Sequence, residues 1–93
     1  MPKQIFVTDH AAKRFAERDI PQELVIKIIT KAVRIANHEP GRTLCIYKEG
    51  LSKYYTLVIE DEPDQITIIT AYESGKWQIE QYHKVKKYDT KMR

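Results

Sequence analysis

Residues 7–32 read VTDHAAKRFAERDIPQELVIKIITKA, and this stretch decides the fold because it holds two helical patterns on either side of a break. At about 100° per residue, Phe15 and the alanines of the first pattern fall on one side and its charged residues on the other. Thr8 is placed to cap this helix, and the residues up to Pro21 break it. The second pattern repeats apolar residues at helical spacing, at Leu24, Val25, Ile28, Ile29 and Ala32. The sequence therefore predicts an N-terminal helical hairpin.

Beyond residue 32 the hydrophobic period changes from helical to strand-like. Turn residues separate four strand patterns, at residues 33–35, 43–48, 53–60 and 65–72. Short turns join antiparallel neighbours, so the strands form a meander. A short β-like run at residues 5–7 precedes the hairpin, and residues 77–82 fit a strand or a helix equally. The predicted class is α+β, with the helical hairpin packed on one face of a curved antiparallel sheet of three or four strands.

The last clear strand has two largely apolar sides. Strict alternation places Ile66 and Ile68 on one side together with Thr70 and Tyr72. This favours a central strand, buried on one face by the helices and partly covered on the other. Lys48 and Tyr54 share the surface of Thr70 and Tyr72 if the strand registers agree, and periodicity does not fix a register.

The length of 93 residues and a hydrophobic content of 42% suit one compact domain. We expect it to span residues 1–82, followed by a basic tail at residues 83–93. The net charge is +3, and residues 84–93 carry five basic residues against one acid. A basic end attracts RNA, DNA or an acidic protein surface, and it equally serves as a solubilising tail.

Several classes of protein are disfavoured. The chain has no apolar run near the roughly 20 residues that span a bilayer and no signal-peptide pattern, so we expect a cytoplasmic protein that avoids membranes. Cys45 lies in a strand pattern as a buried thiol. His10, His38 and His83 lie far apart without a nearby cysteine, and the glycines are isolated. We therefore expect no metal site, no phosphate-binding loop and no cofactor.

His10, Arg14 and Arg18 follow one another at i, i+4 spacing on the first helix. An imidazole that titrates near neutral pH, beside two guanidinium groups that bind phosphate in bidentate fashion, suits phosphodiester chemistry. The same pattern also fits a solvated helix face, or arginines that pair with Glu17 or Asp19 to stabilise the hairpin.

Residues 8–20 resemble the opening signature of a small bacterial and archaeal domain of unknown function, T-x-H-A-x-x-R-x-x-E-R-x-I. The segment ITAY at residues 69–72 is similar to the T-x-Y strand of the same family. The resemblance covers about residues 5 to 77. That family is similar in layout to the RelE, ParE and BrnT toxins of the barnase, EndoU and colicin group.

The resemblance implies helices packed on a curved antiparallel sheet and a metal-independent ribonuclease toxin that an antitoxin neutralises. It marks five candidate catalytic residues, His10, Arg14, Arg18, Thr70 and Tyr72. Sheet geometry and the tail add candidate RNA-binding residues, Lys48, Lys53, Tyr54, Lys86 and Lys87. The substrate would be messenger or ribosome-bound RNA. The exposed sheet edge and an apolar second face around Ile66 and Ile68 would hold an antitoxin or a second copy of the chain. The alternative is a non-enzymatic domain that binds a protein or nucleic acid through its basic surface.

Overall fold

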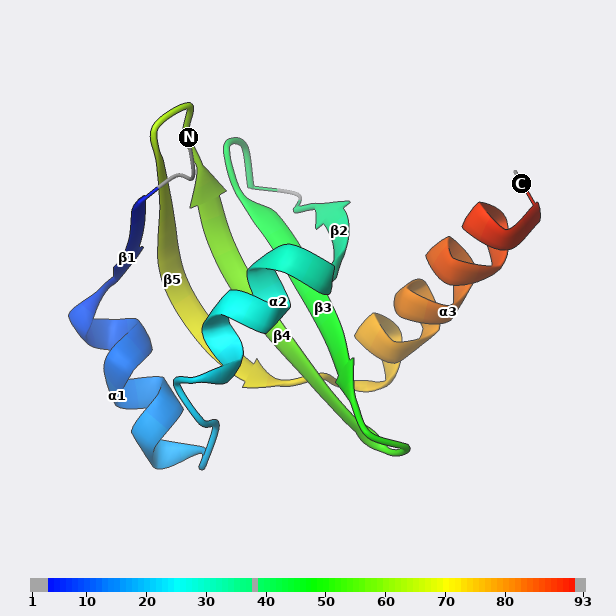
Figure 1. Ribbon diagram of the computed structural model, residues 1–93, viewed down its shortest axis with the longest axis horizontal. Coiled ribbons are helices and arrows are strands. Elements are labelled where there is room, and N and C mark those ends of the chain that lie inside the picture. The colour runs from blue at the N-terminus through cyan, green and yellow to red at the C-terminus, as the bar shows by residue number, and fades with distance from the viewer. Residues whose placement is uncertain (1–3, 38, 92–93) are drawn as a thin grey trace.

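The computed structural model describes residues 4–37 and 39–91, and side chains within residues 4–37 and 39–87. Residue 38 and the last two residues of the predicted tail lie outside these described residues. In the described part the elements follow the order β1 (Gln4–Val7), α1 (Asp9–Glu17), α2 (Leu24–Lys31), β2 (Val33–Ala36), β3 (Thr43–Glu49), β4 (Lys53–Asp61), β5 (Gln65–Glu73) and α3 (Lys76–Lys91). The strands form one sheet in the order β1-β5-β4-β3-β2 (Figure 1). The predicted α+β class is confirmed.

The start of the chain differs from the prediction. The described part begins with the strand β1 and not with the helical hairpin, and β1 pairs in parallel with β5, with Gln4 opposite Gln65 and Val7 opposite Ile68. The other strand pairs are antiparallel, so the sheet is mixed and has five strands within the described residues. Periodicity identifies the run at residues 5–7 as β-like, but it carries no information about a partner some sixty residues away.

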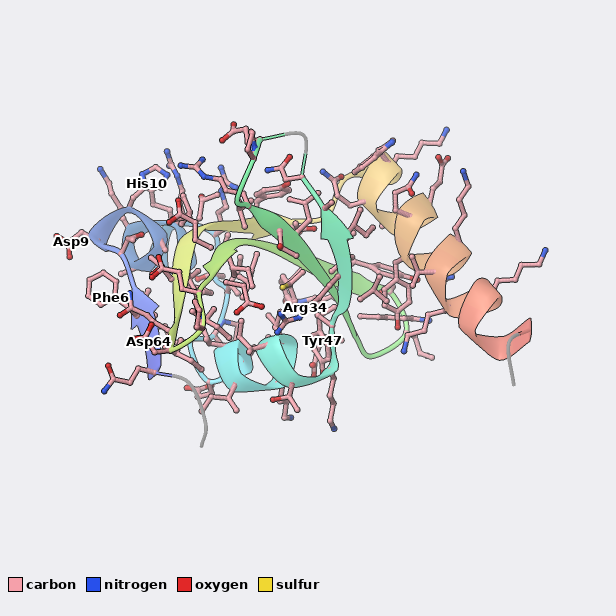
Figure 2. All side chains as sticks on the ribbon, turned by 90° about the horizontal axis from the view of Figure 1, so that it is seen from above. Phe6, Asp9, His10, Arg34, Tyr47 and Asp64 are labelled. Carbon is pink, nitrogen blue, oxygen red and sulfur yellow. The ribbon has the colours of Figure 1, made fainter. Side chains whose placement is uncertain are left out.

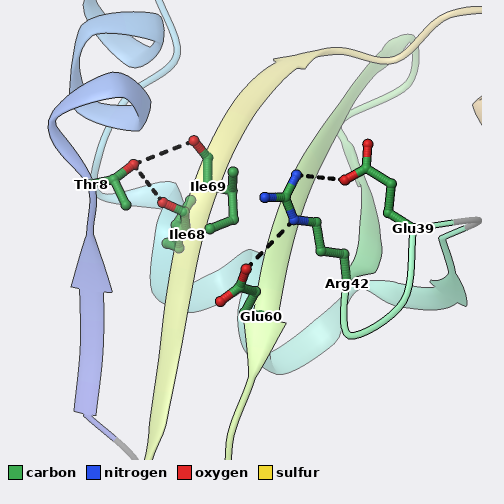
Figure 3. Close-up of polar contacts among 6 residues, drawn as sticks. All are labelled: Thr8, Glu39, Arg42, Glu60, Ile68 and Ile69. Carbon is green, nitrogen blue, oxygen red and sulfur yellow. Dashed lines mark hydrogen bonds and ion pairs between the residues drawn. The ribbon is translucent and has the colours of Figure 1, made fainter.

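Thr8 connects α1 to the sheet. Its hydroxyl accepts from the backbone N–H of Ala11 at 3.1 Å, as expected for an N-cap. The same hydroxyl donates toward the carbonyl oxygens of Ile68, at 2.9 Å, and Ile69, at 3.3 Å (Figure 3). The predicted cap is therefore confirmed, and it also anchors the first turn of α1 to β5.

The main core lies between the sheet and the first two helices. α2 covers one face of the sheet and α1 runs beside β5 (Figure 1). The buried side chains of this core are aliphatic or aromatic for the most part: Ala11, Phe15, Ile20, Leu24, Val25, Ile28, Cys45, Tyr55, Leu57, Ile59, Ile66, Ile68 and Ala71. The helical period predicted the buried positions of α2 and, on α1, Ala11 and Phe15, whereas Ala16, expected on the same side, is exposed.

α3 begins three residues after β5, on the side of the sheet away from α2, and runs outward past the edge of the sheet at β2 (Figure 2). The segment at residues 77–82, which fits either a strand or a helix by its sequence, is thus helical. Five side chains on this face of the sheet are also buried, Val33, Leu44, Ile46, Thr56 and Val58. Thr56 is fully buried, and its hydroxyl is hydrogen-bonded to Ser74 Oγ at 2.7 Å. None of the helices in the described part is long and apolar enough to span a membrane.

Candidate nucleic-acid site

β5 contains one more residue than β4 over the same length. Val58 pairs with Thr70, whereas the next residue of β4, Ile59, pairs with Ile68. Ile69 is therefore the extra residue of a β-bulge. The carbonyl oxygens on which Thr8 anchors α1 belong to this bulge. The helix start and the irregularity of the strand thus meet at one point (Figure 3).

The bulge changes which side chains of β5 share a face. Ile66 and Ile68 face the helices together with Ala71, and all three are buried in the main core. Thr70 and Tyr72 face the other way, toward the side of α3. The prediction that Ile66 and Ile68 share a face with Thr70 and Tyr72 is wrong, because an extra residue reverses the alternation beyond it. The predicted apolar second face around the two isoleucines is consequently not exposed to a partner.

The pairing of β3 with β4 places two other candidates, Lys48 and Tyr54, on the same face of the sheet as Tyr72. Lys48 lies directly opposite Tyr54, and Thr56 lies directly opposite Tyr72. Lys48, Tyr54 and Tyr72 therefore share one face, the arrangement that the sequence left open. Lys53 precedes Tyr54 and falls on the other face by alternation.

The cationic stripe of α1 lies beside the C-terminal half of β5. Arg18 Nη1 donates to the carbonyl oxygen of Ala71 at 3.2 Å. Arg14 Nη1 forms an ion pair with Glu17 Oε2 at 2.6 Å. His10 is exposed on the first turn, on the side of the sheet away from α2 (Figure 2).

An open cavity of about 380 Å³ lies where α1 ends beside β5, and Arg18, Tyr72 and Glu73 line it. Gln78 of α3 reaches the same place, because its Nε2 donates to the Tyr72 hydroxyl at 3.3 Å. A guanidinium group offers five N–H donors, of which the Ala71 carbonyl accepts one. The cavity therefore combines a cation, a phenol and a carboxylate, a set that can bind an anion and transfer protons.

Glu73 was not among the residues that the sequence singled out. Its position directly after the T-x-Y segment at the end of a strand is the signal that could have found it. His10, Arg14 and Thr70 lie on the elements that border the cavity but do not line it. Of the five predicted catalytic residues, Arg18 and Tyr72 thus line the cavity, and so does this acid, which follows Tyr72 directly on β5.

A second cluster lies between α3 and the start of β4. The Tyr54 hydroxyl and His83 Nε2 are 3.0 Å apart. The rings of Tyr54, Tyr82 and His83 contact one another edge to face, with centroids 5.5 to 5.8 Å apart. Lys48 Nζ lies 5.7 Å from the ring centroid of Tyr54, and Lys86 Nζ lies 5.8 Å from that of Tyr82. The sequence missed the role of His83, since contact with Tyr54 depends on how α3 packs.

Two titratable groups under the other face have shifted pKa values. Burial raises the pKa of the Cys45 thiol to about 11. Desolvation and then the neighbouring Glu49 raise the pKa of Tyr47. A thiol that stays protonated at neutral pH is a poor nucleophile, so Cys45 is a residue of the core and not of a reactive site. Within the described residues, no three histidine, cysteine or acidic side chains converge as metal ligands.

The fold and the cavity define a small α+β domain with a mixed polar site at one end of its central strands. Residues 7–73 match the profile of the family described as Domain of unknown function (DUF4258), and the chain belongs to this family. This match confirms the resemblance to a domain of unknown function. No curated protein and no solved structure matches the chain significantly. The matched segment includes α1 and β5 and ends before α3.

Proposed function

We propose that this protein is a metal-independent ribonuclease of the toxin type, with its active site in the cavity at the end of β5. The observation that carries the proposal is that Arg18, Tyr72 and Glu73 all line that cavity. Metal-free cleavage requires a base for the 2′-hydroxyl, an acid for the leaving oxygen and a cation for the phosphorane. The three side chains offer one group for each task.

In the proposed reaction the carboxylate of Glu73 takes the proton of the 2′-hydroxyl, whose oxygen attacks the adjacent phosphorus. The bond from phosphorus to the 5′-oxygen breaks, and the Tyr72 hydroxyl donates a proton to that leaving oxygen. Arg18 stabilises the extra negative charge of the pentacoordinate intermediate. The products are a 2′,3′-cyclic phosphate and a 5′-hydroxyl end.

The other two candidates on α1, His10 and Arg14, are spaced so that they would contact neighbouring parts of the RNA. His10 lies eight residues before Arg18, which is about 12 Å along a helix, too far to contact the same phosphate. Arg14 lies halfway between them and is paired with Glu17, with side chains 33% and 42% exposed. Such exposed pairs contribute at most about 1 kcal/mol, so a phosphate can compete for Arg14. His10 and Arg14 thus position the RNA along α1, and Thr70 contributes a hydroxyl beside them.

The toxin part of the proposal rests on the resemblance to the RelE, ParE and BrnT group and on the layout of helices beside a mainly antiparallel sheet. An antitoxin would then be the regulatory partner. The edge strand β1 offers unpaired backbone groups beside Phe6, whose side chain is 56% exposed. A partner strand can add to such an edge.

The test is cleavage of a long, structured RNA by the purified chain in EDTA, with and without ribosomes. We expect the wild type to cut, and Glu73→Gln to lower the rate by about 10²- to 10⁴-fold, as loss of a general base does. Glu62→Gln, in the exposed turn between β4 and β5, removes the same charge and is the matched surface control, which should cut like the wild type. Absence of cleavage under both conditions would refute the proposal and favour the binding domain, whereas equal cleavage by Glu73→Gln would refute Glu73 as the general base.

A further inference from the structure

We propose that α3, the end of β3 and the start of β4 form a docking surface for single-stranded RNA that adjoins the cavity. The surface is defined by Lys48, Tyr54, Tyr82, His83, Lys86 and Lys87, and we call it the α3 surface. The choice of RNA as the ligand rests on the proposed function. The inference adds that the RNA is single-stranded and that it has a second contact site outside the cavity.

The centre of the α3 surface is aromatic and ordered. Tyr54 comes from the sheet and Tyr82 from α3, and their rings meet at an interplanar angle of 77°. His83 contacts both rings and is hydrogen-bonded to the Tyr54 hydroxyl, although its own side chain is exposed. Aromatic rings held in place at a surface are the groups on which unpaired bases stack.

Positive charge surrounds this centre. Lys48 and Lys86 lie over the rings of Tyr54 and Tyr82. Lys87 follows on the same helix and is exposed. The cations of the α3 surface come from two elements, β3 and α3. The charge therefore complements a phosphodiester backbone that passes over the rings.

The combination favours a single strand over a duplex. In a double helix the bases are stacked on one another, so their faces are not accessible to tyrosine and histidine rings. In a single strand the bases can leave the stack and contact a tyrosine or histidine ring, which contributes affinity without requiring a particular sequence. Only an unpaired strand can therefore place its bases on the rings and its phosphates beside the cations at the same time.

The α3 surface is continuous with the cavity. Gln78 of α3 donates to the Tyr72 hydroxyl, which lines the cavity. Tyr54 and Tyr72 share one face of neighbouring strands, with Thr56 directly opposite Tyr72. A strand bound along α3 therefore leads toward the proposed site of cleavage. Because α3 lies beyond the segment that matches the family, this contact site would be an addition to the family's common domain.

The experiment measures fluorescence anisotropy with a short labelled oligouridylate whose 2′-hydroxyls are methylated. Methylation blocks the proposed cleavage, so binding is read without turnover, and the result is independent of whether the chain is a nuclease. The test variant carries Lys48→Gln and Lys87→Gln. The matched control carries Lys53→Gln and Lys27→Gln, which remove the same charge from other faces of the molecule.

We expect the test variant to bind more weakly than the control, and its slope of log K against log salt to be smaller by about 1.4, at about 0.7 per lost contact with a single strand. His83→Ala should weaken binding about fivefold or more, the lower range for loss of one stacked base. Equal losses in test and control variants would overturn the proposal, as would equal affinity for a duplex of the same length. Thermal melting of each variant confirms that it is folded.

Discussion

The face of the sheet toward α2 is covered by a buried core that is mostly aliphatic, whereas the face toward α3 combines buried apolar residues with exposed or half-buried polar groups. Leu57 and Ile59 point from β4 into the first face, and Tyr54 and Thr56 point from the same strand into the second. Because side chains alternate along a strand, the residues of β4 that build the core point to one face, and those with polar groups near the surface point to the other. The α2 face should therefore control stability, and the α3 face should control function.

The largest expected effect comes from the core. Phe15 is 2% exposed and packs in the main core, so Phe15→Ala should lower the free energy of unfolding by about 3–5 kcal/mol. Phe6 is 56% exposed on β1, and Phe6→Ala is the matched control, with an expected cost below about 1 kcal/mol. Chemical denaturation measures both. Similar costs for the two variants would contradict the assignment of the core to the α2 face.

The buried thiol gives a pH dependence with a defined sign. The pKa of Cys45 is raised from 9.0 to about 11 in the folded chain. As pH rises through this range the unfolded chain loses the thiol proton first, so the folded state loses stability relative to it. The stability difference between wild type and Cys45→Ala should therefore shrink between pH 9.0 and about 11, by roughly 2–3 kcal/mol at most. Denaturation curves at several pH values measure it, and a difference that stays constant would contradict burial of the thiol.

Thr8 connects the two regions, since its hydroxyl caps α1 and bonds to the bulge of β5. Thr8→Ala should lower the free energy of unfolding by about 1–2 kcal/mol, the upper range for loss of an N-cap. Thr8→Ser keeps the hydroxyl and should lose less. Thermal unfolding compares the two variants, and an equal loss would mean that the methyl group and not the hydrogen bonds matters.

The smallest expected effect is on the α3 face. Tyr54→Phe removes the hydroxyl that bonds to His83 but keeps the ring, so it should cost about 1 kcal/mol or less. Affinity for single-stranded RNA should stay close to that of the wild type because the stacking surface remains. Melting and anisotropy measurements check both parts. A large loss of stability would place this pair among the groups that hold the fold.

The sequence predicted the local features well. The two helices, the cap at Thr8 and the strand patterns after residue 32 agree with the structure, because each depends on neighbours within a few residues. It did not predict the parallel pairing of β1 or the bulge at Ile69, because both depend on partners far away in the chain. The assignment of Ile66 and Ile68 was wrong for the same reason.

The candidate site could be predicted only in part. Arg18 and Tyr72 were singled out by spacing and resemblance, and the structure places both beside one cavity. Glu73 was missed because an acid at a strand end has no distinctive pattern. His83 was missed because the segment around it fits a basic tail, and only packing of α3 on the sheet brings it to Tyr54.

The local patterns of the sequence predicted the first two helices, the strands after residue 32 and most buried positions of these helices, but not α3. These properties follow from the periodicity of side chains along a short segment. Only the tertiary structure decided that Lys48, Tyr54 and Tyr72 share a face, that Lys53 does not, and that Glu73 joins Arg18 at the cavity. The physical reason is that strand register, the bulge and helix docking are set by hydrogen bonds and packing between distant parts of the chain, which no local pattern encodes.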